Sequence, residues 1–538
     1  MDTLLKISDL SVAYRTPRQG EKLAVSGVSL AVSPGEMTAI VGESGSGKST
    51  TAQAALGLLP KSATVLGGQI TFAGRGMVGL SDRAWRDVRG TRIGYIPQDP
   101  NNSLNPTKTI GASVGEGLAI HRVGDAKARR EKVVRLLDKV GIDNPDKRYD
   151  QYPHELSGGM KQRALIAAAV ALEPDLIIAD EPTSALDVTV QKVILDLLDE
   201  MRAELGIGIL FITHDLAVAG DRADRVVVME DGQVRESGIA AAVLTDPKAP
   251  YTKRLLANAP SLSAAPVRRP AVPANAGAPA LLEVRDVTQR FGDFTAVDGV
   301  SFSVPRGSTH AIVGESGSGK TTTGRSIAMF NRPTAGEVMF KGQDLTQASA
   351  KEIRRLRGSI QLVYQNPYSS LNPRMSIGDA VAEPVRNLGR ATKRQARQTA
   401  REFLELVSLD PSMYDRSPAE LSGGQRQRVA IARAIVIEPE LVVLDEAVSA
   451  LDVTVQAQIL ELLDRLQRDL DLTYVFISHD LAVVNQISDT VSVLSRGRQV
   501  EVGKTADIFA HPQTDYTARL INAIPGQRYR AGDLNLGL

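Results

Sequence analysis

The chain of 538 residues contains the same succession of motifs twice, and this repeat constrains its fold more than any other feature. The segment GESGSGKST at 42–50 returns as GESGSGKTT at 314–322, an offset of 272 residues. Farther along, Ser157, Glu181 and His214 each have a counterpart 265 residues later. Because the order is kept and the offset changes only early, we interpret the chain as a tandem duplication with short deletions in the second copy.

Each copy begins with an expected antiparallel stretch and continues with apolar strands that alternate with helical segments. Such alternation predicts an α/β fold with a mostly parallel sheet wrapped by helices. Further helical insertions are expected around 126–140 and 393–407. The predicted domains are residues 1–260 and 281–530, and the Pro- and Ala-rich segment 261–280 is predicted to be a solvated linker between them.

Each glycine-rich segment lies between a short apolar strand and a predicted helix, which is the arrangement of a P-loop. Glycines let backbone N–H groups surround phosphate oxygens, and the helix N-terminus favours their negative charge. Lys48 and Lys320 are expected to reach the β/γ-phosphates, and the hydroxyls of Ser49 and Thr321 to bind Mg²⁺. The other expected phosphate-binding residues are Gly42, Ser44, Gly45, Ser46, Gly47 and Thr50, and Gly314, Ser316, Gly317, Ser318, Gly319 and Thr322. The chain is thus predicted to bind two nucleoside triphosphates.

An apolar strand that ends in two acids occurs in each copy, as LIIADE and as LVVLDE. Alone, such an ending fits a helix-capping turn as well as a catalytic pair, but downstream of a P-loop it favours catalysis. Asp180 and Asp445 are expected to help hold Mg²⁺. Glu181 and Glu446 are expected to orient and deprotonate the attacking water.

A Ser-Gly-Gly sequence precedes a predicted helix in each copy, within LSGGM at 156–160 and LSGGQ at 421–425. This is ordinary N-cap chemistry, but it also presents a hydroxyl, bare amides and a helix N-terminus to an anion. Together with the P-loops, the sequence resembles the ATP-binding-cassette (ABC) ATPase family over nearly the whole chain, twice. The resemblance implies two tandem ABC-type P-loop NTPase domains. Each has a RecA-like mixed sheet, an antiparallel β subdomain and a helical subdomain.

The resemblance also implies roles for residues that no simple pattern identifies. Gln98 and Gln365 correspond to the Q-loop glutamines, which contact Mg²⁺ and relay the nucleotide state to a membrane partner. His214 and His479 correspond to the switch histidines at the γ-phosphate, although a histidine at a strand end can be purely structural.

The same resemblance implies a further pair of segments and a pair of aromatic residues. Residues 184–187 and 449–452 correspond to the D-loops. Tyr14 and Phe291 are candidates for the aromatic side chain that stacks on adenine, with packing in the core as the alternative. ATP rather than GTP is expected from the family alone, because the phosphate-handling residues do not distinguish the two.

In this family two cassettes enclose two ATP molecules, each between the P-loop of one copy and the signature of the other. The P-loop and catalytic glutamate of the first copy are therefore expected to work with Ser422, Gly423, Gly424 and Gln425. Those of the second copy are expected to work with Ser157, Gly158 and Gly159.

The two copies depart from the family pattern at two places. Met160 stands where the second copy has Gln425, which removes a polar side chain near the second site's phosphate. Ala447 stands where the first copy has Pro182, which changes the stiffness of a loop. Neither departure removes a catalytic group, so both sites are expected to hydrolyse ATP.

Two more pairs of repeated segments indicate which subfamily of ABC ATPases the chain resembles. QDPNNSLNP at 98–106 matches QNPYSSLNP at 365–373, and a YTxRL motif lies within 246–260 and 511–525. Singly these fit turns and an amphipathic docking helix. Jointly they resemble the dipeptide/oligopeptide and nickel permease ATPases, here as a fused pair.

That resemblance implies the energising subunit of an importer of peptides or a similar small solute, with nickel, glutathione-like and oligosaccharide cargo left open. The expected partners are two integral membrane permeases and an external solute-binding protein. The chain is then expected to be peripheral, at the cytoplasmic face of the cell membrane.

The composition excludes several kinds of site and disfavours other classes of protein. The chain has no cysteine, which excludes disulfides, cysteine-ligated zinc and the iron–sulfur cluster that many relatives carry near a C-terminus. A net charge of +1 offers no electrostatic footprint for nucleic acid. The main alternative, a soluble double-cassette ATPase acting on ribosomes, is disfavoured by this charge and by the short, nearly uncharged linker.

Overall fold

The computed structural model describes residues 3–16, 20–183, 186–262, 280–366, 370–389, 391–449 and 451–526. These residues form two compact units, which we describe one at a time. Unit 1 contains Met1–Leu186, Val190–Leu262 and Pro525–Leu538, and unit 2 contains Asp187–Thr189 and Ser263–Ile524. Most of the predicted linker, residues 263–279, lies outside the described residues, as do Ser184, Ala185 and Ala450 of the D-loops.

The core of unit 1 is a six-stranded sheet in the order β10-β9-β3-β8-β7-β6. All its neighbouring strands run parallel except the β9/β10 pair. Every residue of β3, β7 and β8 is buried, as the continuous apolar runs of a covered parallel sheet require. The strands are β3 (Met37–Val41), β6 (Ile93–Ile96), β7 (Leu176–Asp180), β8 (Gly208–Thr213), β9 (Arg225–Glu230) and β10 (Gln233–Ile239).

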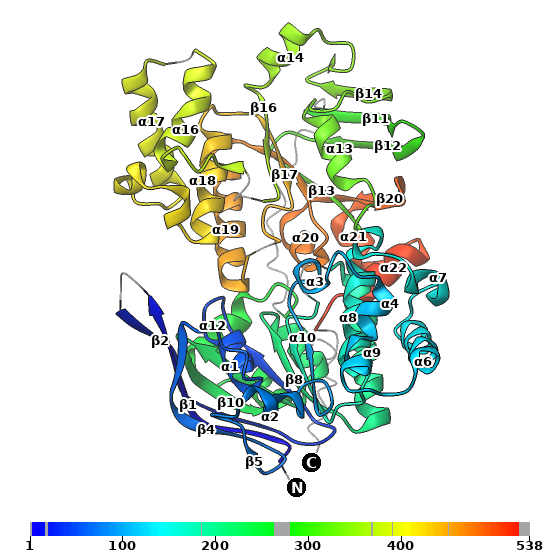
Figure 1. Cartoon of the computed structure of the whole chain (residues 1–538). Coiled ribbons are helices and arrows are strands. Elements are labelled where there is room, and N and C mark those ends of the chain that lie inside the picture. Colours follow the sequence, from blue (N-terminus) through cyan, green and yellow to red (C-terminus); the bar gives the residue numbers. More distant parts are fainter. Residues whose placement is uncertain are drawn as a thin grey trace. The chain divides into compact units, whose positions relative to one another are not determined.

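A second, antiparallel sheet in unit 1 has the order β2-β1-β4-β5 and forms the blue ribbon of Figure 1. Its strands are β1 (Leu5–Thr16), β2 (Gly20–Val32), β4 (Ala63–Phe72) and β5 (Arg75–Gly76). Alternate apolar residues of this sheet pack with the buried Trp85 and with the helix that follows the P-loop. The expected antiparallel β subdomain is therefore present.

The helices of the first copy cover the core sheet and build a helical subdomain. The expected helix around 126–140 is α6, which begins after the N-cap Asp125. The helices are α1 (Lys48–Ala55), α2 (Asp82–Arg86), α3 (Pro100–Ser103), α4 (Ile110–Val114), α5 (Glu116–Ile120), α6 (Ala126–Lys139), α7 (Pro145–Tyr149), α8 (Gly158–Val170), α9 (Val188–Leu205), α10 (Leu216–Arg222), α11 (Ala240–Thr245) and α12 (Pro250–Asn258).

Unit 2 repeats this strand order in one ten-stranded sheet, β15-β14-β11-β12-β20-β19-β13-β18-β17-β16. Its antiparallel and mostly parallel parts meet at one paired position, Asp298 with Arg498, whose side chains also form an ion pair of 2.9 Å. The strands are β11 (Leu282–Phe291), β12 (Phe294–Val304), β13 (Thr309–Gly314), β14 (Ala335–Phe340), β15 (Gln343–Asp344), β16 (Ile360–Val363), β17 (Leu441–Asp445), β18 (Thr473–Ile477), β19 (Thr490–Ser495) and β20 (Arg498–Lys504).

The helices of the second copy follow the same plan, and α16, α17 and α18 pack together as a helical subdomain (Figure 1). The expected helix around 393–407 is α17. No helix in the described ranges is long and apolar enough to cross a lipid bilayer. The helices are α13 (Lys320–Ile327), α14 (Ala350–Leu356), α16 (Ile377–Asn387), α17 (Lys393–Leu406), α18 (Gly423–Ile435), α19 (Val453–Leu470), α20 (Leu481–Ile487), α21 (Thr505–Ala510) and α22 (Asp515–Asn522).

The strand that leads to the second P-loop carries a buried histidine. The imidazole of His310 forms hydrogen bonds of 2.8 Å with Thr490 Oγ1 and 2.9 Å with Ser492 Oγ. Its ring also stacks on Phe302, with 4.1 Å between ring centroids. Burial lowers the pKa of His310 to about 3, so the ring is neutral in the fold.

This histidine makes the stability of unit 2 depend on pH. The unfolded chain takes up a proton near pH 6.5, whereas the folded chain does so only near pH 3, so the free energy of unfolding falls as pH decreases between these values. We expect wild type to lose roughly 2 kcal/mol more than His310→Asn between pH 7.5 and pH 5. Urea unfolding of the full chain at both pH values measures this. An equal pH dependence in both proteins would show that His310 is not held neutral.

Candidate nucleotide-binding sites

The first glycine of each P-loop occupies a place that only glycine fits. Gly42 has φ 152° and Gly314 has φ 147°. A Cβ atom at Gly42 would lie 2.2 Å from the carbonyl oxygen of Met229, and one at Gly314 would lie 2.1 Å from that of Leu494. The chain therefore passes directly against the neighbouring strand before it turns into the loop.

The P-loop lysines are buried and held by the backbone of their own loops. Lys48 Nζ donates to the carbonyl oxygens of Gly42 and Glu43, each at 2.8 Å. Lys320 repeats these two contacts in unit 2 at the same distances. Burial lowers the pKa of Lys320, despite the acidic groups around it. Each ammonium is thus placed at the N-terminus of the helix that follows the loop.

The predicted metal-binding hydroxyl and carboxylate lie together in each unit. Ser49 Oγ donates to Asp180 Oδ1 at 3.0 Å, and Thr321 Oγ1 donates to Asp445 Oδ1 at 2.9 Å. Burial raises the pKa of both aspartates, and the hydroxyl hydrogen bonds only partly oppose this. Paired oxygen donors of this kind suit a hard cation such as Mg²⁺.

In unit 1, three predicted residues from distant parts of the chain meet at one carboxylate. Gln98 Nε2 donates to Glu181 Oε2 at 2.9 Å. The same oxygen lies 3.3 Å from His214 Nδ1. The ends of two neighbouring strands, β7 and β8, bring the glutamate and the histidine together at the carboxyl edge of the sheet.

Unit 2 contains the same group. Gln365 Nε2 donates to Glu446 Oε2 at 2.7 Å, and His479 Nδ1 lies 3.4 Å from Glu446 Oε1. The glutamine, glutamate and histidine that the sequence separates by more than 100 residues are therefore assembled twice, from equivalent positions.

The glutamate and histidine of each group shift each other's proton affinity. Burial alone would raise the pKa of Glu181 and Glu446, but the hydrogen bonds and charges of His214 and His479 hold both pKa values below the usual value. Burial alone would lower the pKa of each histidine, yet the glutamate raises it. At neutral pH the glutamates are ionised and are able to accept a proton.

Both of these glutamates have an unusual backbone conformation. Glu181 has φ 45° and Glu446 has φ 48°, in the left-handed region that side-chain-bearing residues rarely adopt. Their N–H groups donate to the carbonyl oxygens of Ile212 at 2.9 Å and Ile477 at 3.0 Å. Such strain is typical of functional positions and turns the carboxylate off the strand direction. The sequence contains no signal for it.

The two Ser-Gly-Gly segments begin helices, as predicted, but they do so differently. Ser157 Oγ accepts the N–H of Met160 at 3.3 Å, and Ser422 Oγ accepts that of Gln425 at 3.3 Å. Only the second is a full capping box, because Gln425 Oε1 also accepts the N–H of Ser422 at 3.0 Å. The pairing of each P-loop with the signature of the other copy stays a prediction.

The missing half of the first capping box is testable. We expect Met160→Gln to stabilise unit 1 by about 0.5–1 kcal/mol, because it supplies the acceptor for the Ser157 N–H. The reverse change, Gln425→Met, is expected to destabilise unit 2 by a similar amount. Urea unfolding measures both, with Met160→Leu as the control that adds no acceptor. A Met160→Gln protein no more stable than Met160→Leu would contradict the assignment.

The two aromatic candidates differ in their surroundings. Tyr14 is half-buried, and its hydroxyl is 3.3 Å from Thr50 Oγ1 at the start of the P-loop helix. Phe291 is 51 % exposed, at the end of β11. A stacking role for either stays a prediction.

Two other tyrosines contact the P-loops and were not predicted from the sequence. The hydroxyls of Tyr251 and Tyr516 each lie 3.2 Å from a P-loop amide nitrogen. The repeated YTxRL motif was the available signal.

The fold and these groups define an ATPase of the P-loop class, and comparison with known proteins specifies it. The family model described as ABC transporter matches residues 25–184 and 297–449, and the one described as oligopeptide/dipeptide transporter, C-terminal region, matches residues 500–535. The chain belongs to the ABC transporter family, as the sequence resemblance predicted. It binds and hydrolyses ATP.

Several curated relatives match along nearly their whole length. The peptidoglycan transport ATP-binding protein YejF of Agrobacterium fabrum is 45% identical over 97% of this chain and 96% of its own. The glutathione import ATP-binding protein GsiA of Salmonella paratyphi A is 41% identical over 97% and 89%. The oligopeptide transport ATP-binding protein OppD of Mycobacterium tuberculosis is 39% identical over 98% and 99%. Each of the three alignments spans both copies of this chain.

Proposed function

We propose that the chain is the energy-coupling subunit of an importer, and that its two ATP sites drive uptake of dipeptides, oligopeptides or a similar small solute. The observation that carries this proposal is the matched C-terminal region at 500–535, which contains the second YTxRL motif. The relatives whose names state peptidoglycan transport, glutathione import and oligopeptide transport support the same class of solute. The proposed partners are two permeases and an external solute-binding protein, at the cytoplasmic face of the membrane.

Within each site, the residues present suit Mg²⁺ bound together with ATP. The described residues include no group of three or more acidic or histidine side chains able to hold a metal by themselves. A hydroxyl, a carboxylate and the Q-loop amide oxygen therefore fit an ion whose other ligands are phosphate oxygens and water. Mg²⁺ would neutralise developing phosphate charge. Its proposed ligands are Ser49, Gln98 and Asp180 in the first copy and Thr321, Gln365 and Asp445 in the second.

We also propose which residue accepts the proton of the attacking water. Glu181 is ionised and lies at the edge where the P-loop strand ends, so we infer that it accepts the proton of the attacking water. In this structure its carboxylate is held by Gln98 and His214. Both contacts are made by Glu181 Oε2, and we propose that movement of the Q-loop changes the orientation of this carboxylate toward water, which makes the Q-loop a control point for hydrolysis.

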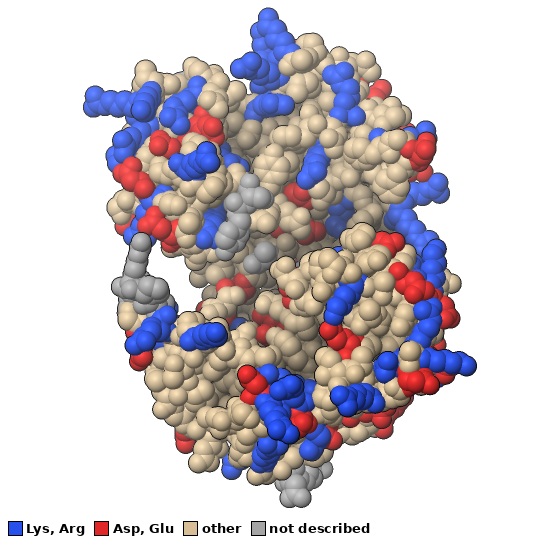
Figure 2. All heavy atoms as spheres, in the orientation of Figure 1, with Lys and Arg blue, Asp and Glu red and all other residues tan. Residues whose placement is uncertain are grey.

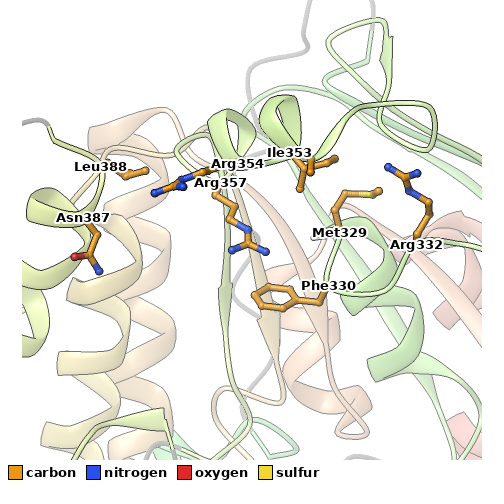
Figure 3. Close-up of a pocket in the computed structure, with 9 residues that line it drawn as sticks. Met329, Phe330, Arg332, Ile353, Arg354, Arg357, Asn387 and Leu388 are labelled. Carbon is orange, nitrogen blue, oxygen red and sulfur yellow. The ribbon is translucent and has the colours of Figure 1, made fainter.

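A groove in unit 2 supports a permease contact near the Q-loop of the second copy, which contains Gln365. It has a volume of about 650 Å³ and lies between the end of α13, α14 and the end of α16. In Figure 3 the guanidinium of Arg357 lies over the ring of Phe330, with a distance of 5.9 Å to the ring centroid. The described lining includes Arg332, Arg354 and Arg357 and no acidic side chain. We propose that a short permease helix with an acidic residue occupies this groove.

An adjoining pocket of about 670 Å³ extends from the groove to the residue before the Q-loop glutamine. It shares Phe330 and Arg357 with the groove, and Tyr364 forms part of its wall. Tyr364 directly precedes Gln365, whose amide donates to the catalytic glutamate of unit 2. A helix that enters or leaves the groove is therefore placed to move Gln365 and to change the freedom of that glutamate.

The surface charge gives no support to a nucleic-acid partner. Figure 2 shows basic and acidic side chains interspersed over the visible face of each unit. The charge of the whole chain is +1. A ribosome-acting role would be expected to require a coherent basic surface.

Co-expression with two permeases from one importer tests the proposal. We expect the chain to co-purify with them from detergent-solubilised membranes, and Arg357→Glu to lose this association. Lys504→Glu is the matched control. Lys504 ends β20, and four strands of the sheet separate β20 from β16, the strand that follows Arg357. Failure of wild type to associate with any permease pair, or recovery with ribosomes in the presence of ATP, would reject the importer proposal.

A further inference from the structure

One peptide group in the first P-loop is held at both of its edges. The N–H of Glu43 donates to the hydroxyl of Tyr251 at 3.2 Å. The carbonyl oxygen of Gly42 accepts from Lys48 Nζ at 2.8 Å. This N–H and this C=O belong to the same planar peptide and point in opposite directions. Rotation of the peptide would therefore break both contacts at once.

The second P-loop is held in the same way. The N–H of Glu315 donates to Tyr516 at 3.2 Å, and Lys320 Nζ donates to the carbonyl oxygen of Gly314 at 2.8 Å. The hydroxyl of Tyr516 in turn donates to the carbonyl oxygen of Leu494 at 3.4 Å. That tyrosine therefore joins the P-loop to the strand beside it.

The helix that carries the first tyrosine is fixed to the core sheet at its start. Glu236 on β10 accepts the N–H of Lys248 at 2.7 Å and that of Ala249 at 3.0 Å, just before α12 begins. The side chain of Tyr251 is then 5 % exposed. A buried ring on an anchored helix places its hydroxyl with little freedom.

The second copy has the same anchor, although the sequences around it differ. Glu501 on β20 accepts the N–H of Gln513 at 2.9 Å and that of Thr514 at 3.3 Å, just before α22. The anchor, the helix and the tyrosine are thus present in both copies at equivalent positions. Both copies of the duplication have therefore kept this arrangement, although the residues that donate to the anchoring glutamate differ.

We propose that Tyr251 and Tyr516 are positioning residues of the two nucleotide sites, each holding the first P-loop peptide in the orientation that phosphate binding requires. In the described structure the lysine shares this task. When a phosphate draws the lysine away from the loop carbonyls, the tyrosine hydroxyl remains to prevent rotation of the peptide. The helix with the YTxRL motif is then part of the ATP site. This inference rests on the proposed role of the P-loops and not on the identity of the solute.

Equilibrium binding of radiolabelled ATP to the full chain tests it, in the background Glu181→Gln/Glu446→Gln to prevent turnover. We expect Tyr251→Phe to weaken one of the two sites about 5- to 10-fold, Tyr516→Phe the other, and the double variant both. Hydrogen exchange provides a second readout, because the Glu43 amide should exchange faster in Tyr251→Phe. Tyr474→Phe is the matched control. Tyr474 lies near the start of β18, whereas the nucleotide site is at the carboxyl end of the sheet, and its hydroxyl donates to the carbonyl oxygen of Leu463 on α19 at 3.0 Å. Removing this hydrogen bond should leave ATP affinity unchanged.

Two results would overturn the inference. One is ATP affinity within twofold of the background chain in both Tyr251→Phe and Tyr516→Phe. The other is a loss of affinity equally large in Tyr474→Phe, which would indicate a general effect on stability. Lys48→Ala separates this inference from the function on which it rests. If Lys48→Ala weakens a site and Tyr251→Phe does not, only the tyrosine role is rejected; if neither does, the P-loop assignment fails as well.

Discussion

Replacing both Glu181 and Glu446, the proposed catalytic glutamates, with glutamine is expected to reduce ATP turnover by about 10²- to 10⁴-fold while ATP remains bound. Glutamine keeps the size of Glu181 and Glu446 but has no carboxylate to accept the proton of water. The left-handed backbone at each position is no worse for glutamine than for glutamate. Each single change is expected to remove a substantial share of turnover, because both copies contain the complete glutamine–glutamate–histidine group.

The chain offers a closely matched control for this experiment. Glu173 and Glu438 lie eight residues before the catalytic glutamates, and both also have a left-handed backbone, each with φ 53°. Glu173→Gln and Glu438→Gln therefore make the same chemical change in the same backbone conformation, away from the site. Steady-state ATP hydrolysis and equilibrium ATP binding are measured on all variants. A single Glu181→Gln or Glu446→Gln chain with unchanged turnover would show that its site does not work.

The second large effect is expected from Gly42→Ala. Its added Cβ would lie 2.2 Å from the main-chain carbonyl oxygen of Met229, on β9, which is paired on both sides, with β10 and with β3. The left-handed φ adds further strain. We expect the free energy of unfolding of unit 1 to fall by roughly 3 kcal/mol or more, and ATP affinity at that site to fall by about 100-fold or more.

Gly35→Ala isolates the contribution of φ. Gly35 has φ 69° in the same unit, but a Cβ there meets no atom within 4 Å. This change is expected to cost about 1 kcal/mol and to leave ATP binding intact. Urea unfolding and calorimetric ATP binding distinguish the two variants. If Gly42→Ala behaves like Gly35→Ala, the close approach to Met229 is not a constraint on the loop.

The sequence predicted the parts of the site that follow from local pattern and from duplication. The strand ends with Asp180 and Asp445, the P-loop lysines and the N-cap serines all lie where their motifs placed them. This succeeded because parallel strands deliver their carboxyl ends to one edge of a sheet, whatever the loops between them contain.

Other features depend on contacts between segments far apart in the chain, and no local pattern encodes them. The partners of Tyr251 and Tyr516 lie about 200 residues away, so the YTxRL motif was recognised but not placed. His310 lies in the apolar strand before the second P-loop, and its buried hydrogen bonds to Thr490 and Ser492 require a neighbouring strand 180 residues later. The left-handed backbone of Glu181 likewise accompanies a hydrogen bond from its N–H to Ile212 on β8, 31 residues later.

The central prediction, which we keep as a proposal, is that each ATP molecule is bound by the P-loop of one copy and the signature of the other. Because the chain has no native cysteine, paired substitutions allow a direct measurement by disulfide crosslinking. The chain Glu181→Gln/Glu446→Gln is given Ser44→Cys with either Ser422→Cys or Ser157→Cys, then oxidised with and without ATP, and the linked peptides are identified by mass spectrometry. We expect an ATP-dependent link within one chain between positions 44 and 422. A link between 44 and 157 in its place would contradict the account.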